Sequence, residues 1–205
     1  MSRKEELHQQ AKKKLEDFEV LMRQGHFDYG NGFHGRVYLN PHQLFRYPST
    51  IWRLAQDLLD VLPGELLAQT EVVAGPATGG ALLAHTLAGL LDGRRALTHA
   101  PCSFAPFTNG GDGFGLRDFY ARQINGRRVL IADDVRNTGK TFQVCAGLVR
   151  GAGGSVLATV EICDRMEAVV DAGVPNYALV DYQAPENHAA ADCPMCKAGE
   201  PVTSF

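Results

Sequence analysis

The chain has 205 residues, 45% of them apolar and 21% charged, which suits one globular domain of ordinary size with a small appendage. Its net charge of −3 gives no electrostatic reason to expect a nucleic acid or a membrane surface as a partner. No apolar run approaches the roughly 18 residues of a membrane span, and the polar N-terminus lacks a signal peptide's apolar stretch, so we expect a cytoplasmic protein.

The first third of the chain predicts two helices on either side of a glycine-rich segment. Leucines at helical spacing predict an amphipathic helix over residues 3–23. Residues 25–39 mix glycines with aromatic side chains, which indicates a hairpin or an irregular pair of strands. A second helix is expected from Pro48 to the Pro63-Gly64 pair, with Ser49 or Thr50 as its cap.

From residue 71 onward, short apolar runs alternate with helical stretches. This alternation is typical of a parallel sheet with right-handed crossovers, so the predicted fold class is α/β, a parallel twisted sheet flanked by helices. The predicted strands cover residues 71–74, 95–99, 128–132, 155–163 and 177–182, and the predicted helices cover residues 81–91, 140–151 and 166–172. Residues 108–115 contain four glycines and predict a flexible loop.

The segment from Val129 to Thr141, Val-Leu-Ile-Ala-Asp-Asp-Val-Arg-Asn-Thr-Gly-Lys-Thr, carries the clearest chemical signal. A buried strand runs into two acids, Asp133 and Asp134, and a loop of small and hydroxylated residues then leads into a helix. Ligands of open parallel sheets lie beyond the carboxyl ends of the strands. Backbone N–H groups at a helix N-terminus bind phosphate, whereas paired carboxylates suit ribose hydroxyls. The segment therefore predicts a site for a phosphorylated sugar.

Other interpretations of this segment fit less well. Gly139-Lys140-Thr141 contains the end of a P-loop, but the required glycine five positions earlier is replaced by Asp134. A dinucleotide-binding fingerprint is also missing, because no G-x-G-x-x-G follows a strand. An ordinary turn after an acidic strand end is the remaining alternative.

The same segment resembles the phosphoribosyl-pyrophosphate motif of type I phosphoribosyltransferases, with Asn137 where that family usually has Thr or Ser. The resemblance implies that Asp133 and Asp134 position the ribose. It also implies a 5′-phosphate loop made of Val135, Arg136, Asn137, Thr138, Gly139, Lys140 and Thr141. A second glycine-rich turn resembles the family's pyrophosphate loop and comprises Gly75, Pro76, Ala77, Thr78, Gly79 and Gly80.

Within that family the chain is most similar to orotate phosphoribosyltransferase. The segment from Gly25 to His34 resembles its N-terminal motif, Asp164-Arg165-Met-Glu167 resembles its Asp-Arg-x-Glu signature, and the tail from Cys193 resembles the ending of one subgroup. The resemblance implies that Arg165, with Phe33 and Arg36, binds the base. It also implies three parts: an N-terminal helix with a hood-like segment (1–65), an α/β core (66–185) and a tail with Cys-x-x-Cys (186–205).

Several positions depart from the orotate pattern. Residues 104–116, where the family carries a lysine-rich mobile catalytic loop, contain no Lys, Arg or His. Thr78-Gly79 stands where many relatives have Tyr-Lys. We expect the loop at 108–122 to close over the site, with Arg117 or Arg122 bringing positive charge to the diphosphate. A homologue that uses another base, or that senses phosphoribosyl-pyrophosphate without catalysis, remains the alternative.

The resemblance implies an enzyme that transfers the phosphoribosyl group from 5-phosphoribosyl-1-pyrophosphate to a nucleobase, with orotate as the first choice. Departure of diphosphate from an anomeric carbon generates oxocarbenium character. Its charge is best stabilised by Mg²⁺ held through substrate and water, without direct protein ligands. The resemblance also implies a homodimer.

The cysteines and histidines suggest no separate chemistry. Cys193 and Cys196 form half of a zinc site, and the remaining ligands could come from His188 with Cys163 or Asp192. There is no second Cys-x-x-Cys, and the histidines have no metal-binding spacing. The sequence therefore favours structural or incidental thiols and argues against a histidine metal site.

Overall fold

The computed structural model describes residues 3–17, 20–22, 25–29, 32–95, 99–110, 113–166, 170–183 and 186–204. Its core is a six-stranded sheet of order β10-β9-β8-β5-β6-β7, in which every neighbouring pair is parallel except β6 and β7. The strands are β5 (Val72–Pro76), β6 (Ser103–Gly110), β7 (Gly113–Gly115), β8 (Arg128–Arg136), β9 (Ser155–Asp164) and β10 (Asn176–Asp181). The predicted α/β class with a mainly parallel sheet is confirmed.

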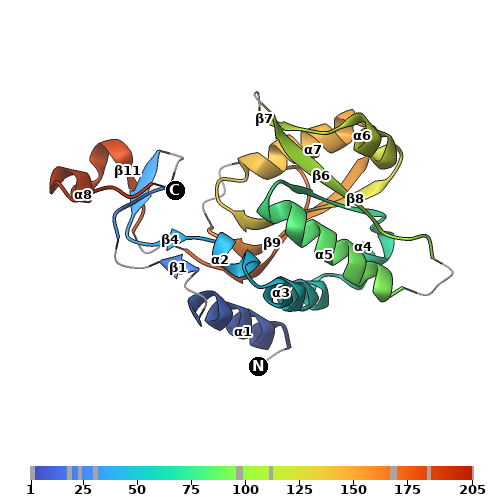
Figure 1. Ribbon diagram of the computed structural model, residues 1–205, viewed down its shortest axis with the longest axis horizontal. Helices are drawn as coiled ribbons and strands as arrows, with labels where there is room; N and C mark the ends of the chain where they lie inside the picture. Colours follow the sequence, from blue (N-terminus) through green and yellow to red (C-terminus); the bar gives the residue numbers. More distant parts are fainter. Residues whose placement is uncertain are drawn as a thin grey trace.

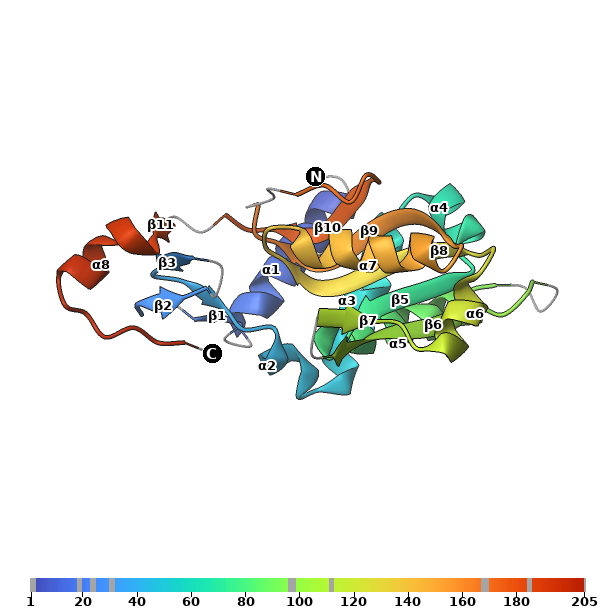
Figure 2. The same ribbon diagram turned by 90° about the horizontal axis from the view of Figure 1, so that it is seen from above.

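Helices cover both faces of this sheet (Figures 1 and 2). One face carries α1 (Arg3–Asp17), α3 (Pro48–Val61) and α5 (Gly79–Gly93), and the other carries α6 (Asp118–Ile124) and α7 (Lys140–Gly151). A short helix, α4 (Gly64–Gln69), connects α3 to β5. No helix among the described residues is long and apolar enough to cross a membrane.

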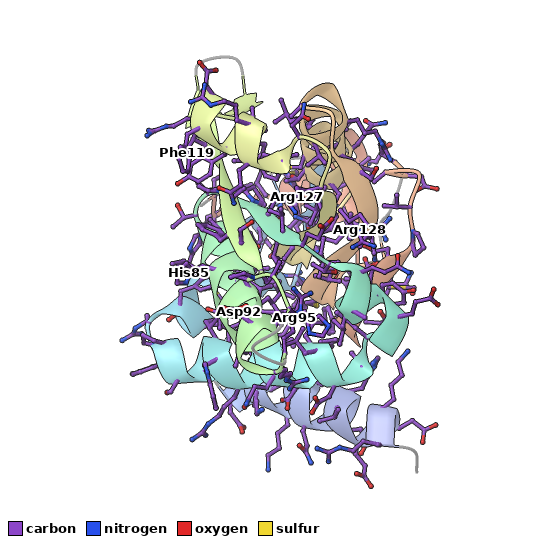
Figure 3. All side chains as sticks on the ribbon, turned by 90° about the vertical axis from the view of Figure 1, so that its right-hand side faces the viewer. His85, Asp92, Arg95, Phe119, Arg127 and Arg128 are labelled. Atoms are coloured by element: carbon purple, nitrogen blue, oxygen red, sulfur yellow. The ribbon has the colours of Figure 1, made fainter. Side chains whose placement is uncertain are left out.

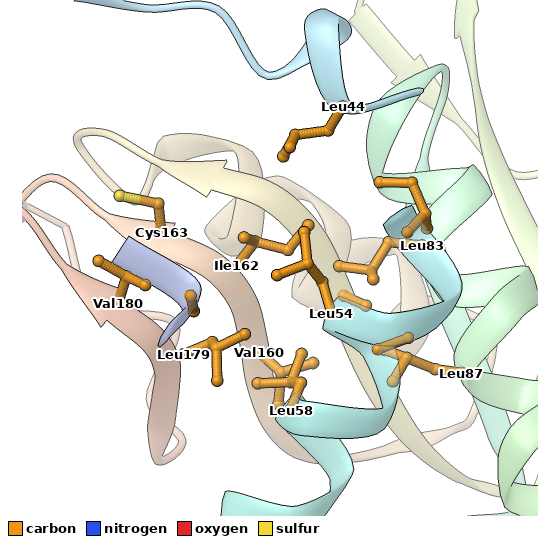
Figure 4. Packing of buried hydrophobic residues seen from close by; sticks show 14 of the residues in the cluster. Leu44, Leu54, Leu58, Leu83, Leu87, Val160, Ile162, Cys163, Leu179 and Val180 are labelled. Atoms are coloured by element: carbon orange, nitrogen blue, oxygen red, sulfur yellow. The ribbon is translucent and has the colours of Figure 1, made fainter. Parts of the chain in front are cut away.

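Alternation along β8 explains why the sheet is covered twice. Leu130 and Ala132 pack into the cluster under α3 and α5, whereas Val129 and Ile131 pack into the cluster under α7. Because successive side chains of a strand point to opposite faces, an unbroken apolar run requires cover on both sides. Figure 4 shows the first cluster, in which leucines of α3 and α5 contact the branched side chains of β9 and β10.

A small lobe stands beside the core (Figure 2). Its sheet has the order β11-β3-β2, and all neighbours are antiparallel. Its elements are β2 (Phe27–Asp28), β3 (Phe33–Gly35), β11 (His188–Ala189), a 3-10 turn (Ala190–Asp192) and α8 (Pro194–Lys197). A pair of short strands, β1 (Leu21–Met22) and β4 (Tyr38–Leu39), and the helix α2 (His42–Phe45) lead from this lobe back to the core. The tail therefore completes the sheet that the N-terminal segment begins.

Two predicted features near the N-terminus differ from the structure. The first helix ends at Asp17 rather than at residue 23, because Leu21 and Met22 pair with Leu39 and Tyr38 as β1. The second helix is confirmed at Pro48–Val61, but its N-cap is Tyr47, and Pro48 occupies the first turn. Strand pairing between residues 21–22 and 38–39 thus takes the place of the last helical turn that the spacing of apolar residues predicted.

Three further predictions from the core also need correction. The second core strand along the chain is β6 rather than residues 95–99. Residues 96–98 lie outside the described part, and the Arg95 side chain donates hydrogen bonds to the carbonyls of Leu67 and Thr70. The expected loop at 108–115 is the β6–β7 hairpin, of which residues 111–112 are not described. In the expected helix 166–172, Met166 has φ +57° and residues 170–172 are not helical, while 167–169 are not described.

Candidate active site

The carboxyl end of β8 presents two adjacent carboxylates. Asp133 is 8% exposed, and its Oδ1 accepts a hydrogen bond of 2.9 Å from the Asp134 N–H group. Asp134 Oδ1 accepts one of 2.7 Å from the Val135 N–H group. Each side chain is thus held by the next peptide along the strand, which fixes both carboxylates at the end of β8.

Burial controls the charge of this pair. Desolvation, and secondly the neighbouring Asp134 charge, raise the pKa of Asp133 well above its usual value. Desolvation also raises the pKa of Asp134, against hydrogen bonds and the nearby His42, which lower it. Because both carboxyl groups resist ionisation, the pair favours ligands that stabilise a buried negative charge, such as a cation or the hydroxyl donors of a sugar.

The 75–80 loop contacts this pair closely. A Cβ atom on Gly79 would overlap the Asp134 carboxylate, and one on Gly80 would lie 2.6 Å from Asp133 Oδ1. A Cβ on Gly75 would overlap the Gly80 carbonyl and lie 2.7 Å from the Ala132 carbonyl oxygen. The loop needs glycines because it approaches the end of β8 with no room for side chains.

A hollow opens where the two loops meet. Its lining comprises His42, Pro76, Ala77, Thr78, Gly79, Gly80, Phe114, Asp133, Asp134 and Thr141. A second hollow shares Asp133 and Thr141 with the first and is lined by residues 133 and 135–142. The predicted 5′-phosphate loop and the predicted pyrophosphate loop therefore lie on either side of the acidic pair, although the sequence separates them by more than 50 residues.

The phosphate-sized loop leads directly into α7. Gly139 is the N-cap residue of this helix and has φ +85°, a conformation that glycine adopts without strain. The Thr138 carbonyl accepts a hydrogen bond of 3.1 Å from the Val170 N–H group. Free N–H groups at the start of a helix favour anions. Arg136 is committed elsewhere, since its Nη1 donates to Asp164 Oδ2 at 2.8 Å.

Arg165, predicted to bind the base, directly follows β9 and is only 3% exposed. Its guanidinium stands 4.1 Å from the centre of the Tyr29 ring, a cation–π contact, and the Tyr29 hydroxyl donates to the Val37 carbonyl at 2.7 Å. Burial raises the pKa of Tyr38, while the Arg165 charge lowers it and the Asp134 charge raises it. Tyr38 thus lies within electrostatic range of both Arg165 and the acidic pair.

The other two predicted base residues lie in the small lobe. Phe33 is in β3 and is 39% exposed. Arg36 follows the same strand, and its two terminal nitrogens donate to the Glu200 carboxylate at 2.6 and 2.9 Å. The structure therefore pairs Arg36 with the tail, whereas Arg165 packs against the Tyr29 ring.

The two predicted loop arginines are separated. Arg117 is exposed at the start of α6, three residues beyond Phe114, which lines the hollow. Arg122 lies at the opposite, amino-terminal edge of the sheet, in a depression shared with Glu71 and Arg127. That edge faces the viewer in Figure 3, where Arg127 and Arg128 are labelled. Arg122 therefore does not lie beside the acidic pair of its own chain.

Two residues that line the first hollow were not among the predicted site residues. His42 comes from α2, and Phe114 comes from the β6–β7 hairpin. His42 carries no spacing signal, and Phe114 lies in a stretch whose glycines predicted a loop. Only the hairpin, and the path of α2 over α5, bring these side chains to the end of β8.

Comparison with known proteins assigns the chain to a family, although no protein-family model matches it. It is 31% identical over 195 residues to an orotate phosphoribosyltransferase of Caldanaerobacter subterraneus, covering 94% of this chain and 95% of the relative. Another of that name, from Erythrobacter litoralis, is 35% identical over 181 residues, covering 88% of each chain.

Solved structures agree on the fold. The crystal structure of an orotate phosphoribosyltransferase from Aeropyrum pernix superposes with a TM-score of 0.64 at 23% identity, covering 82% of this chain and 92% of that one. An adenine phosphoribosyltransferase from Thermoanaerobacter pseudethanolicus gives 0.62 at 17% identity, covering 83% and 99%. The architecture is that of the type I phosphoribosyltransferases, and the chain belongs to the orotate phosphoribosyltransferase family.

Proposed function

We propose that the protein transfers the phosphoribosyl group from 5-phosphoribosyl-1-pyrophosphate to a ring nitrogen of orotate, a step of pyrimidine nucleotide synthesis. The products are orotidine 5′-monophosphate and diphosphate. One observation carries the proposal: the 75–80 loop meets the end of β8 so closely that a Cβ atom on Gly79 would overlap the Asp134 carboxylate and one on Gly80 would lie 2.6 Å from Asp133 Oδ1. Two phosphate-sized loops on either side of two acids match a ribose phosphorylated at both ends.

The donor is held by groups of opposite character. Asp133 and Asp134 accept hydrogen bonds from the ribose hydroxyls, because carboxylates bind hydroxyl donors and repel phosphates. Residues 135–141 hold the 5′-phosphate with backbone N–H groups ahead of α7, and Lys140 adds a cation. Residues 75–80 hold the diphosphate in the adjoining hollow. This assignment separates the two phosphate ends and exposes the anomeric carbon between them.

Arg165 is the cation for the base. Orotate is a planar monoanion, and a guanidinium held against the Tyr29 ring at 4.1 Å presents a fixed positive charge to a carboxylate. Phe33 and Arg36 are secondary candidates, since Arg36 would first have to leave Glu200. Arg165 therefore selects for an acidic base over a neutral one.

The acidic pair also fits the magnesium that this chemistry requires. Two buried carboxylates with raised pKa values form an oxygen donor set that favours a cation in their vicinity. When bound, Mg²⁺ neutralises charge on the diphosphate. The chain's own contribution is to orient the ribose with Asp133 and Asp134. Phe114 limits water near the anomeric carbon, and Arg117 approaches the leaving group from the hairpin side. Arg122 could take this role only at another subunit's site.

We also propose that the enzyme works in the cytoplasm as a homodimer. Light scattering at micromolar protein concentration measures the molar mass directly. A molar mass equal to that of one chain would contradict the dimer.

The decisive experiment measures diphosphate release from phosphoribosyl-pyrophosphate and Mg²⁺ with a panel of bases: orotate, uracil, adenine, guanine and hypoxanthine. Release with orotate alone is expected. Diphosphate release with a different base would identify that base as the acceptor. Binding of the donor without diphosphate release would identify a sensor. Both outcomes contradict the proposed reaction.

A paired substitution tests the donor site. Asp133→Asn with Asp134→Asn keeps the shape and removes the charge, so it should abolish donor binding by calorimetry while thermal unfolding remains cooperative. Asp60→Asn on α3 is the matched control, because Asp60 forms an ion pair with Arg94 and does not line the hollow that contains the acidic pair. Unaltered donor binding by the double variant would refute the assignment.

A further inference from the structure

Four side chains outside the active site converge in the small lobe. They are His26, His34, Cys193 and Cys196, and one potential ligand atom of each lies within 4.8 Å of the others. His26 precedes β2 and His34 lies in β3. Cys193 is the N-cap residue of α8 in the tail, and Cys196 lies within that helix. Residues about 160 positions apart thus meet in one cluster, whereas His188, Cys163 and Asp192, the partners considered from sequence, are not part of it.

Four of the six spacings within the cluster are close to those of a tetrahedron around one ion. Zinc binds sulfur at about 2.3 Å and nitrogen at about 2.0–2.1 Å, so tetrahedral angles separate sulfur from nitrogen by about 3.6 Å and two nitrogens by about 3.3 Å. His26 Nε2 lies 3.5 Å from Cys193 Sγ and 3.6 Å from Cys196 Sγ. His34 Nδ1 lies 3.3 Å from Cys196 Sγ and 3.1 Å from His26 Nε2.

Hydrogen bonding alone does not account for this arrangement. His26 Nδ1 lies 3.0 Å from the Glu200 carbonyl oxygen, which can only accept, so this nitrogen carries the proton. Nε2 of a neutral His26 then has a single lone pair, yet three polar atoms surround it. One lone pair cannot satisfy three neighbours separately, whereas a shared cation at their centre satisfies all four groups at once.

The surroundings of the histidines also fit metal ligation. A metal-bound histidine usually directs its other ring nitrogen to a backbone carbonyl or a carboxylate. His26 does so with Glu200, and the remaining nitrogen of His34, Nε2, faces Asp28 Oδ1 at 3.9 Å. The His26 imidazole is therefore held with Nε2 toward the cysteines, and His34 presents Nδ1 to Cys196.

The backbone holds the two halves of the cluster together independently of the ligands. The Thr203 N–H group donates to the His26 carbonyl at 2.8 Å, and the Asp28 N–H group donates to the Thr203 carbonyl at 3.0 Å. Strand β11 pairs with β3 so that His188 stands opposite His34. Cys193 and His26 are 0% and 4% exposed, so a cation between them is shielded from water on one side.

We propose that His26, His34, Cys193 and Cys196 bind one Zn²⁺ as a structural site. Two thiolates and two imidazoles in tetrahedral positions select zinc over hard cations such as Mg²⁺. Four protein ligands leave no open position, so the ion joins the tail to the β2–β3 pair and performs no catalysis. It acts in the small lobe as a cross-link would, and it is separate from the proposed Mg²⁺ in the phosphoribosyl site.

The test measures metal content and affinity rather than turnover. After purification without added metal and dialysis, the protein should contain one zinc ion per chain, measured by inductively coupled plasma mass spectrometry. Cobalt substituted for zinc should give the visible absorption of a tetrahedral cobalt thiolate. Loss of an outer-shell partner typically weakens metal binding by about 10- to 100-fold. Cys196→Ser removes a direct ligand, so it should weaken zinc binding by more than that. Cys102→Ser is the control, because Cys102 precedes β6 in the core.

Because Cys196 is exposed, its serine variant should fold, so loss of metal can be separated from loss of structure. Equal zinc affinity in the Cys196→Ser and Cys102→Ser variants would overturn the proposal. So would a wild-type protein that competes for zinc no better than a weak chelator. A Cys193–Cys196 disulfide in protein kept under reducing conditions, detected as two missing thiols, would also overturn it.

Discussion

Glu161 is the most unusual single residue of the core. It lies in β9 with 0% exposure, its Oε1 accepts from Asn176 Nδ2 at 2.7 Å, and its Oε2 has no hydrogen-bond partner among the described residues. Burial raises the pKa of Glu161 to about 8, and the nearby Asp164 and Asp181 add to the shift, while Asn176 and Arg136 oppose it. The folded protein therefore keeps this carboxyl protonated at neutral pH.

This shift predicts a pH-dependent stability. The Glu161 carboxyl loses its proton near pH 4.5 in the unfolded chain and near pH 8 in the folded chain. The stability that the protonated carboxyl provides is therefore fully present below pH 4.5 and is lost as the pH rises to about 8. Glu161→Gln removes this pH dependence, because glutamine does not ionise. The variant should gain stability relative to wild type, by on the order of a few kcal/mol at pH 8.

Urea unfolding of both proteins at pH 5, 6.5 and 8 measures the difference, in which contributions from other groups cancel. A difference that stays constant over this range would show that Glu161 titrates normally in the folded chain.

At the scale of elements, the close approach of α5 to β8 shapes the proposed donor site. Gly79 lies in the first turn of α5, where an added Cβ overlaps the Asp134 carboxylate, whereas Gly89 lies in the same helix with nothing within 4 Å. Gly79→Ala must displace the loop or the acid. We expect about a hundredfold loss of turnover, the size expected for a displacement of about 1 Å in a site.

Gly89→Ala is the matched control for this change. It should leave turnover unaltered and stabilise the helix by up to about 1 kcal/mol, because alanine favours helix over glycine. Steady-state kinetics and thermal unfolding of both variants check the pair of expectations. Equal turnover of the two variants would mean that the loop has more freedom than the structure shows.

At the scale of the whole molecule, the tail belongs to the N-terminal segment rather than to the core. Strand β11, the contact of Phe27 with Thr203, and the Arg36–Glu200 ion pair all join residues near 30 to residues near 200. A chain that ends at residue 185 loses these partners but none of the strands of the six-stranded sheet. Its core should therefore fold, while its β2–β3 pair should open.

Hydrogen exchange followed by mass spectrometry checks this prediction. Amides of residues 25–29 and 32–36 should exchange much faster in the shortened chain, and amides of β8 should keep their protection as an internal reference. Unchanged protection of the β2–β3 pair would show that this pair is stable without the tail. Loss of protection in β8 would show that the two parts fold as one unit.

Local patterns were sufficient for the core and for half of the active site. Apolar runs separated by helical stretches predicted four of the strands and the α/β class, because strands covered on both faces need nearly every side chain to be apolar. The end of β8 was also readable, since two acids before a glycine-containing turn and a helix form one continuous segment. Boundaries failed where distant partners intervened, as at Leu21, which pairs with Leu39.

The sequence by itself therefore determined the fold class, because alternating strand and helix patterns are local. It also determined the acidic pair and the two glycine-containing loops of the candidate site, because the pair and each loop lie within a dozen consecutive residues. Tertiary structure alone decided which groups face one another. It set Gly79 against Asp134, stacked Arg165 on Tyr29, moved Arg122 to the far edge of the sheet, and joined His26 and His34 to Cys193 and Cys196. Such contacts depend on chain paths set by packing of the whole core, and residue spacing carries no record of them.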